Sequence, residues 1–176
     1  NSVGISGPGM VTEVTEEVWN RTLDVDLKSM ILICKYAVPA MIESGGGSII
    51  NVSSVDGIRA GMTRNIPYAA AKGGMIAATR AMAVHHGRDN VRVNCIAPGM
   101  LYTSMTESLG KKTRDLRRRV APLGTEGNAE DVALAALFLA SGESRWVTGV
   151  LLPVDAGLMA AGPQSVLDNV LEDLED

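Results

Sequence analysis

The stretch Ser48-Ile49-Ile50-Asn51-Val52-Ser53-Ser54 is a continuous, mainly apolar run bounded by glycines and polar residues. Such a run is typical of a central strand in a parallel sheet, because that strand is buried on both faces and does not alternate. We therefore predict a strand over residues 48–54. Ser54 would lie at its carboxyl end, where open α/β sheets bind their ligands.

An alanine-rich helix is predicted after a loop at residues 55–66. Pro67 favours a helix start, and small side chains continue to His86, which predicts a helix over residues 68–86. Because small side chains let other backbones approach closely, we expect this helix to lie between the sheet and a partner subunit. His85 and His86 are expected at the surface, where the helix dipole favours them, since no carboxylate stands at metal-ligand spacing.

Tyr68 and Lys72 occupy the start of this helix, four residues apart and hence on one face. A phenol titrates near pH ~10, so it becomes a useful acid or base at neutral pH when a cation stabilises its anion. Lys72 can be that cation, and Ser54 can join the pair from the preceding strand. The same spacing also occurs on ordinary half-buried helix faces, so the context decides its meaning.

The rest of the chain alternates helices with strands. Helices are predicted over residues 16–43, 129–141 and onward from residue 165, and further strands over residues 91–97 and 147–154. Pro39 lies inside the first of these helices and should bend or break it. Residues 1–12 are expected to be loop, because no strand precedes their glycines within the chain and the next helix signal comes only at Thr15. The alternation predicts one α/β domain over residues 1–176, with a doubly wound, mainly parallel sheet.

Five short motifs, taken in order, resemble the short-chain dehydrogenase/reductase family over nearly the whole chain. They are Asn1-Ser2-Val3-Gly4, Asn51-Val52-Ser53-Ser54, residues 68–72, Asn94-Cys95-Ile96-Ala97-Pro98-Gly99 with Thr103, and Thr148-Gly149 ahead of Val154-Asp155-Ala156-Gly157. The resemblance implies a Rossmann-type fold. The family opens with a strand and a Thr-Gly-x-x-x-Gly-x-Gly turn for the cofactor pyrophosphate, so we expect the N-terminal strands of that fold to be missing from these residues.

The resemblance also implies a reaction: reversible hydride transfer between NAD or NADP and an alcohol or ketone. Tyr68 would exchange the proton, Ser54 would orient the carbonyl, and Lys72 would lower the pKa of Tyr68 and contact the ribose. The residues implied to touch the cofactor are Asn1, Val3, Gly4, Tyr68, Lys72, Pro98, Gly99, Leu101 and Thr103. An alternative stays open, namely a truncated or degenerate relative that keeps the fold and subunit contacts without catalysis.

Asp26 departs from the family pattern, which has Asn at this position. By resemblance, that Asn interrupts the helix and holds a water linked to the catalytic lysine. An ionised Asp can accept hydrogen bonds but cannot donate them, and it could draw charge from Lys72 away from Tyr68. Alternatively, an acceptor is all that the site needs, and the change is isosteric.

Two regions are candidates for substrate contact. The first is residues 100–122, whose basic run is either the solvated face of a helix or a lid that reads an anionic substrate. This run contains Lys111, Lys112, Arg114, Arg117, Arg118 and Arg119. The second is the loop before Pro67, with Asp56, Arg59, Met62, Arg64 and Asn65.

The composition of the chain excludes several classes of protein and of binding site. The chain has 176 residues, 46% of them hydrophobic, and a net charge of −4, which suits one buried core and argues against a general nucleic-acid binder. Cys34 and Cys95 are too few for a disulfide framework or zinc site, and no metal is expected. Without a membrane-length apolar stretch or a signal sequence, we expect a cytoplasmic protein with no membrane partner that forms a homodimer or homotetramer.

Overall fold

Three parallel strands form the sheet at the centre of the computed structural model, which describes residues 1–61 and 63–171. The strands are β1 (Gly47–Val52), β2 (Val91–Pro98) and β3 (Leu151–Val154), and they lie in the order β1-β2-β3. Asn51 pairs with Cys95 and Cys95 with Leu151, so the carboxyl ends of the strands share one edge. This arrangement confirms the predicted α/β fold with a parallel sheet.

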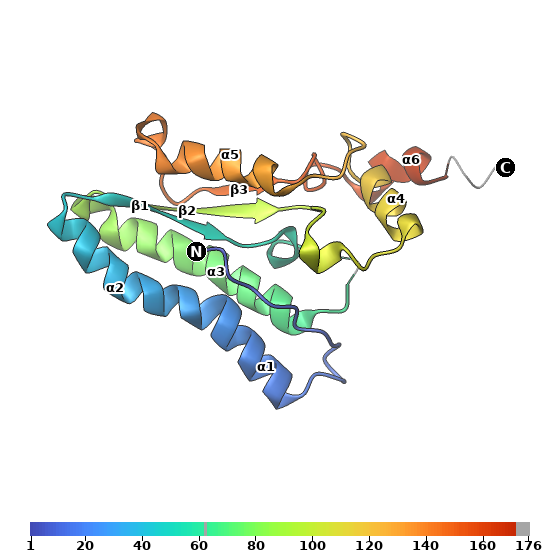
Figure 1. Cartoon of the computed structure of the whole chain (residues 1–176), viewed down its shortest axis with the longest axis horizontal. Helices are drawn as coiled ribbons and strands as arrows, with labels where there is room; N and C mark the ends of the chain where they lie inside the picture. The colour runs from blue at the N-terminus through green and yellow to red at the C-terminus, as the bar shows by residue number, and fades with distance from the viewer. Residues whose placement is uncertain (62, 172–176) are drawn as a thin grey trace.

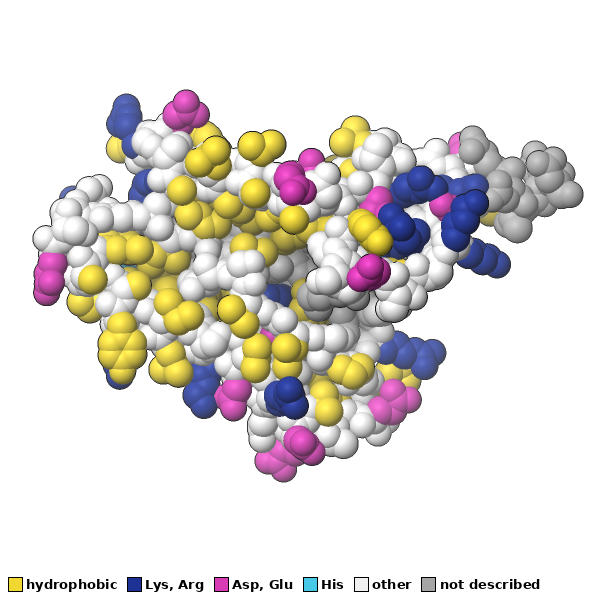
Figure 2. All heavy atoms as spheres, in the orientation of Figure 1, with side chains coloured by type: hydrophobic (Ala, Val, Ile, Leu, Met, Phe, Trp, Pro, Cys, Tyr) yellow, Lys and Arg dark blue, Asp and Glu magenta, His cyan; other side chains and the backbone are white. Residues whose placement is uncertain are grey.

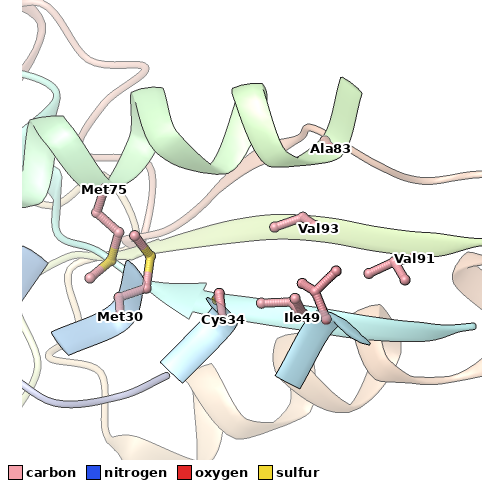
Figure 3. Close-up of a cluster of buried hydrophobic side chains, with 8 residues drawn as sticks. Met30, Cys34, Ile49, Met75, Ala83, Val91 and Val93 are labelled. Carbon is pink, nitrogen blue, oxygen red and sulfur yellow. The ribbon is translucent and has the colours of Figure 1, made fainter. Parts of the chain in front are cut away.

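Helices cover both faces of this sheet (Figure 1). On one face lie α2 (Ser29–Glu43) and α3 (Ile66–His86), and on the other lies α5 (Ala129–Ala140). The core between the sheet and the helices α2 and α3 contains Met30, Cys34, Val38, Ile49, Met75, Ala83, Val91 and Val93 (Figure 3). β2 is buried along almost its whole length, although Arg92 and Asn94 alternate with apolar residues in the first half of its sequence.

The first long helix is interrupted where the sequence departs from the family pattern. It runs as α1 (Glu16–Leu23), a π-helical turn (Asp24–Lys28) and α2, which together match the predicted range 16–43. The Oγ1 of Thr15 accepts a hydrogen bond from the N–H of Val18 and caps the start. α2 continues through Pro39 to Glu43, so the helix is not broken there.

The boundaries of β3 differ from the prediction. A strand was expected over residues 147–154, but it begins only at Leu151. Before that point two backbone bonds join Gly149 and Val150 to β2. The side chain of Asn94 adds to them, because it donates to the carbonyl of Val147 and accepts from the N–H of Val150, at 2.9 and 3.1 Å. Asn94 is fully buried, so these bonds satisfy its amide where water cannot reach it.

The C-terminal third contains two smaller helices, α4 (Lys111–Arg119) and α6 (Leu167–Leu171). The helix expected from residue 165 is therefore short within the described residues, and Leu174 lies outside them. The helices expected over residues 68–86 and 129–141 are confirmed within two residues.

The outer edge of β1 meets the start of the chain. The amino group of Asn1 donates to the carbonyl of Ile50, and the N–H of Val52 donates to the carbonyl of Asn1, both at 2.9 Å. The Asn1 side chain donates to Oδ1 of Asn51, and Nδ2 of Asn51 donates to Oγ1 of Thr79 in α3. Residue 1 thus lies parallel to β1 and is tied through Asn51 to the helix below.

A hollow of about 360 Å³ runs along the same edge, between α2 and α5. Its lining is mainly apolar and includes Ile33, Cys34, Ala37, Ile50 and Ala136. In the described part of the chain, no helix has both the length and the hydropathy that crossing a bilayer requires. The same residues contain no cluster of His, Cys, Asp and Glu arranged to hold a metal ion.

Candidate functional site

Ser54 lies at the carboxyl edge of the sheet, two positions beyond the end of β1, as the sequence predicted. It is the N-cap of a short 3₁₀ turn, Val55–Gly57, and its Oγ accepts a hydrogen bond from the N–H of Asp56 at 3.1 Å. The preceding Ser53 donates its hydroxyl to the carbonyl of Lys72 at 2.8 Å. These contacts fix the turn after β1 against the first turns of α3.

Tyr68 is half-buried in the first turn of α3, where its hydroxyl meets the side chain of Ser54. Burial raises the pKa of Tyr68 above its ordinary value, and the carboxylates of Asp56 and Asp26 add to this rise, while the hydrogen bond with Ser54 opposes it. The sequence predicted the opposite direction, a pKa lowered by Lys72. In this structure the loss of hydration outweighs the hydrogen bond from Ser54.

Lys72 is buried one turn further along α3, with 3% of its surface exposed. Its Nζ donates to the carbonyl of Val52 at 3.2 Å and to that of Val3 at 3.4 Å. The ammonium also lies 5.5 Å from the centre of the Tyr68 ring. Burial lowers the pKa of Lys72, and the nearby Asp26 carboxylate opposes this shift.

Asp26 points inward from the π-helical turn and is fully buried. Its Oδ1 accepts a hydrogen bond from the N–H of Ile5 at 2.7 Å, whereas Oδ2 lies 3.9 Å from Nζ of Lys72. Within the described residues, Oδ2 has no hydrogen-bond partner. Burial raises the pKa of Asp26 above its ordinary value, and the Ile5 N–H and Lys72 act against that rise.

The segment Asn1 to Gly4 reaches the same place from the edge of β1. Val3 is half exposed and gives its carbonyl to Lys72, while Gly4 lies directly beside the Lys72–Asp26 pair. A Cβ on Gly4 would lie 3.1 Å from Nζ of Lys72, so the lack of a side chain allows the backbone to approach the ammonium closely. The structure therefore brings Val3, Gly4, Asp26 and Lys72 together.

Pro98 ends β2 at the carboxyl edge of the sheet, and Gly99, Leu101 and Thr103 follow it. The backbone groups of Leu101 already have partners: its N–H donates to Gly99, and its carbonyl accepts from Arg117 at 3.0 Å. Thr103 caps a 3₁₀ turn, and its N–H donates to Oγ1 of Thr106. The backbone groups of Leu101 that the resemblance assigns to the cofactor are thus engaged within the chain.

The basic run of α4 is partly turned inward, which sequence analysis did not foresee. Glu126 is almost fully buried and accepts two hydrogen bonds from Arg114, at 3.0 and 2.7 Å. It also lies 3.7 Å from Nη1 of Arg117, and Arg114 stacks on the ring of Tyr102 at 3.8 Å from its centre. Sequence analysis missed this contact because Glu126 lies between glycines, 12 residues from Arg114, and no helical or strand periodicity links the two.

The other candidate substrate loop is fastened to the C-terminal region. Arg59 donates to the carbonyls of Leu158 and Ala161 at 2.7 and 3.3 Å. Asp56 accepts a hydrogen bond from Asn65 at 2.8 Å. Met62 lies outside the described residues.

Comparison with known sequences matches most of the chain. A family model described as enoyl-(acyl carrier protein) reductase matches residues 1–159. The 3-oxoacyl-[acyl-carrier-protein] reductase of Thermotoga maritima is 42% identical over 159 residues, which cover 90% of this chain and 64% of that protein. The (3R)-3-hydroxyacyl-CoA dehydrogenase of Mus musculus is 38% identical over 88% of this chain and 60% of its own length. The chain therefore spans less than two thirds of the length of these curated relatives.

Solved structures match the fold as well. A protein from Burkholderia xenovorans described as a short-chain dehydrogenase/reductase is 41% identical, with a TM-score of 0.87 over 92% of this chain and 63% of its own. A protein from Agrobacterium tumefaciens described as a 2-deoxy-D-gluconate 3-dehydrogenase, solved with bound NADP, is 32% identical, with a TM-score of 0.83. This match covers 90% of the present chain and 65% of that structure.

Proposed function

The chain belongs to the short-chain dehydrogenase/reductase family, and we propose that it serves hydride transfer between a nicotinamide dinucleotide and an alcohol or ketone. The observation that carries this proposal is the meeting of Ser54, Tyr68 and Lys72 at the carboxyl edge of the sheet. Each comes from an element whose position is fixed by backbone contacts: the turn after β1 for Ser54, and the first two turns of α3 for Tyr68 and Lys72.

The residues fit the nicotinamide half of such a cofactor. Lys72 offers a cation at the sheet edge, and only the side-chain-free backbone of Gly4 lies against it on one side, so we propose that the ribose hydroxyls bind there. Asn1, Val3, Pro98, Gly99, Leu101 and Thr103 complete the proposed contacts. The backbone groups of Leu101 would have to exchange their present partners for the cofactor, whereas Thr103 would contact it through its hydroxyl. NADP is bound in one of the similar structures, and we propose NAD or NADP here.

In the reductive direction, the bound dinucleotide supplies the hydride. The Ser54 hydroxyl donates a hydrogen bond to the substrate carbonyl oxygen and polarises it. As negative charge develops on that oxygen, Tyr68 gives up its phenolic proton and the product alcohol is formed. The raised pKa of Tyr68 means that the phenol carries its proton at neutral pH but is a weaker acid than a free phenol, so the developing charge on the substrate oxygen has to draw that proton.

Asp26 holds the N–H of Ile5 and stands next to Lys72, so in this proposal it supports the site without touching the substrate. The substrate class is suggested by the named relatives, a 3-oxoacyl reductase and a 3-hydroxyacyl dehydrogenase. We therefore propose a carbonyl group at position 3 of an acyl thioester as the first substrate to test. We propose that the acyl chain lies against the side chains of Leu101 and Tyr102, in the segment that follows β2.

The test is reduction of a 3-oxoacyl thioester by the full-length protein, followed through the absorbance of NADH and of NADPH. We expect turnover that Ser54→Ala lowers strongly and Tyr68→Phe abolishes. A folded protein without turnover on ketones, diketones and oxoacyl thioesters would favour the alternative, a chain that keeps the fold alone.

Self-association is a further part of the proposal. Apolar side chains gather over α5 and toward α2 on the face shown in Figure 2, while Lys and Arg gather over α4. Leu134 and Leu137 of α5 are 68% and 65% exposed, which is unusual for leucines on a helix. We propose that a second copy of the chain covers this face.

A further inference from the structure

We propose that Asp26 is a positioning residue that acts through Lys72, so that ionisation of its carboxylate weakens the influence of the Lys72 ammonium on Tyr68. When Asp26 takes up a proton, that charge becomes free to act on the phenol. The inference rests on the proposed function for its consequence in turnover. Its central claim, an electrostatic link from Asp26 to Tyr68, is a property of the folded chain.

The position of Asp26 indicates that its charge, and not its packing, is what matters at this site. The π-helical turn directs it into the interior, where it is fully buried. One oxygen is satisfied by the Ile5 N–H, and the other faces Lys72 without a hydrogen bond at 3.9 Å. Leaving a buried acceptor unpaired costs about 1–3 kcal/mol, so packing alone does not favour this arrangement.

Lys72 is held in the same way. Its Nζ donates to the carbonyls of Val3 and Val52, and it also lies near Asp26 and the ring of Tyr68. A contact at 3.9 Å without a hydrogen bond is attractive, but it does not lock the two groups together. Since both are buried, their interaction is little screened by solvent or salt.

Several other titratable groups face this pair. Tyr68 lies on α3 beside Lys72, with Asp56 of the 3₁₀ turn next to the phenol, and Cys95 of β2 lies near Lys72. The carboxylates of Asp56 and Asp26 both raise the pKa of Tyr68. Asp56 is also a hydrogen-bond acceptor for Asn65, so Asp26 is the carboxylate whose charge can change with least disturbance of the turn.

The substitution Asp26→Asn isolates the charge. Asparagine keeps the size and can still accept from the Ile5 N–H, but it cannot be ionised. We expect the pKa of Tyr68 to fall by about one unit, because a carboxylate that opposed its ionisation is gone. Asp24→Asn is the matched control, since Asp24 lies in the same π-helical turn but is exposed and paired with Lys28.

The measurement is an ultraviolet titration of tyrosinate in the full-length protein. Subtracting the titration of the corresponding Tyr68→Phe variant isolates Tyr68 from Tyr36 and Tyr102. A lower Tyr68 midpoint in Asp26→Asn, with no change in Asp24→Asn, is the expected result. Equal midpoints in wild type and Asp26→Asn would overturn the inference.

Turnover gives a second readout that separates this inference from the proposed function. The rate of alcohol oxidation should rise with pH as Tyr68 ionises, and in Asp26→Asn this rise should occur about one pH unit lower. A shifted tyrosinate midpoint without any turnover would count against the proposed function and support the electrostatic link.

A third measurement needs no substitution. Carboxyl carbon signals of labelled aspartate in the wild-type protein should include one that titrates above the ordinary value of 3.8. Such a group binds its proton more tightly when folded, so it makes the free energy of unfolding decrease as the pH rises from the unfolded to the folded pKa. If every aspartate titrates at or below 3.8, the buried carboxylate is not as the structure places it, and the inference fails.

Discussion

A Cβ placed on Gly57 would lie 2.7 Å from the carbonyl carbon of Lys72. The turn after β1, which carries Ser54, is therefore in backbone contact with the turn of α3 that carries Lys72. The second close atom is the backbone N of Gly73 at 2.9 Å, so no flexible side chain can move aside.

We predict that Gly57→Ala disturbs the site and lowers stability by about 1–3 kcal/mol, the usual cost of overpacking. Turnover of the full-length protein should fall with it, because Ser54 and Lys72 are pushed apart. Gly87→Ala, at the C-cap of α3, is the control: Gly87 has helical backbone angles and no atom within 4 Å of the added Cβ. Urea unfolding and kcat are measured for both. Equal stability of the two variants would show that the contact is not tight.

Tyr68→Phe should reduce turnover by a factor of about 10²–10⁴ or more, because it removes the transferable proton and keeps the ring. Cofactor affinity should stay within a few-fold, since Lys72 and the sheet edge are unchanged. Tyr36→Phe is the control, as Tyr36 is 72% exposed on α2. Substantial turnover in Tyr68→Phe would remove Tyr68 from the role of proton donor.

The fold was predictable because each element has a local signal. The apolar run before Ser54, the alanine-rich helix after Pro67 and the helix start at Thr15 are all visible within a few residues of sequence. Asp26 could be singled out, but its unpaired oxygen could not, because that depends on Ile5 and Lys72 arriving from other parts of the chain.

Two features had no such signal. The direction of the Tyr68 pKa shift depends on how completely the phenol is buried, and a helical spacing does not report burial. The ion pairs between α4 and Glu126 depend on the path of the chain after the helix, which no local pattern reports. The basic run was predicted to face solvent or an anionic substrate, but two of its arginines contact the buried side chain of Glu126.

Glu126→Gln should therefore loosen α4. The side chain of Arg117 is only 11% exposed. In the variant it would lose the carboxylate that compensates its charge. We expect a loss of about 2 kcal/mol in the free energy of unfolding and faster proteolysis between residues 104 and 120. Glu107→Gln, at an exposed position, should change neither. Unaltered proteolysis in Glu126→Gln would mean that other contacts hold α4.

Self-association should depend on the outer face of α5. Introducing charge with Leu134→Glu and Leu137→Glu together should lower the molecular mass seen by analytical ultracentrifugation, because two leucines buried between copies would become charged. Leu123→Glu is the control, since Leu123 is 73% exposed but lies outside this helix. An unchanged mass in the double variant would place the interface elsewhere or show that the protein is monomeric.

The last prediction concerns cofactor binding by a polypeptide of residues 1–176 alone. Folds of this kind recognise the pyrophosphate through backbone N–H groups of a glycine-rich turn at a helix N-terminus. The glycines of residues 4–9 are followed by α1, whose first turn carries Glu16 and Glu17 and whose N-terminus is already capped by Thr15. Two carboxylates at that position repel a phosphate group. The nicotinamide end is left as the source of affinity, through Lys72, Ser54 and Tyr68.

We therefore expect dissociation constants in the millimolar range for both NAD and NADP, measured separately by isothermal titration. The full-length protein under the same conditions is the reference, and the exposed edge of β1 makes it necessary to check each sample for aggregation first. Low-micromolar binding by residues 1–176 would mean that a second copy completes the site or that the cofactor lies elsewhere. Repeating the titration with Lys72→Met separates these two explanations, because only a cofactor placed at the Lys72 edge loses affinity.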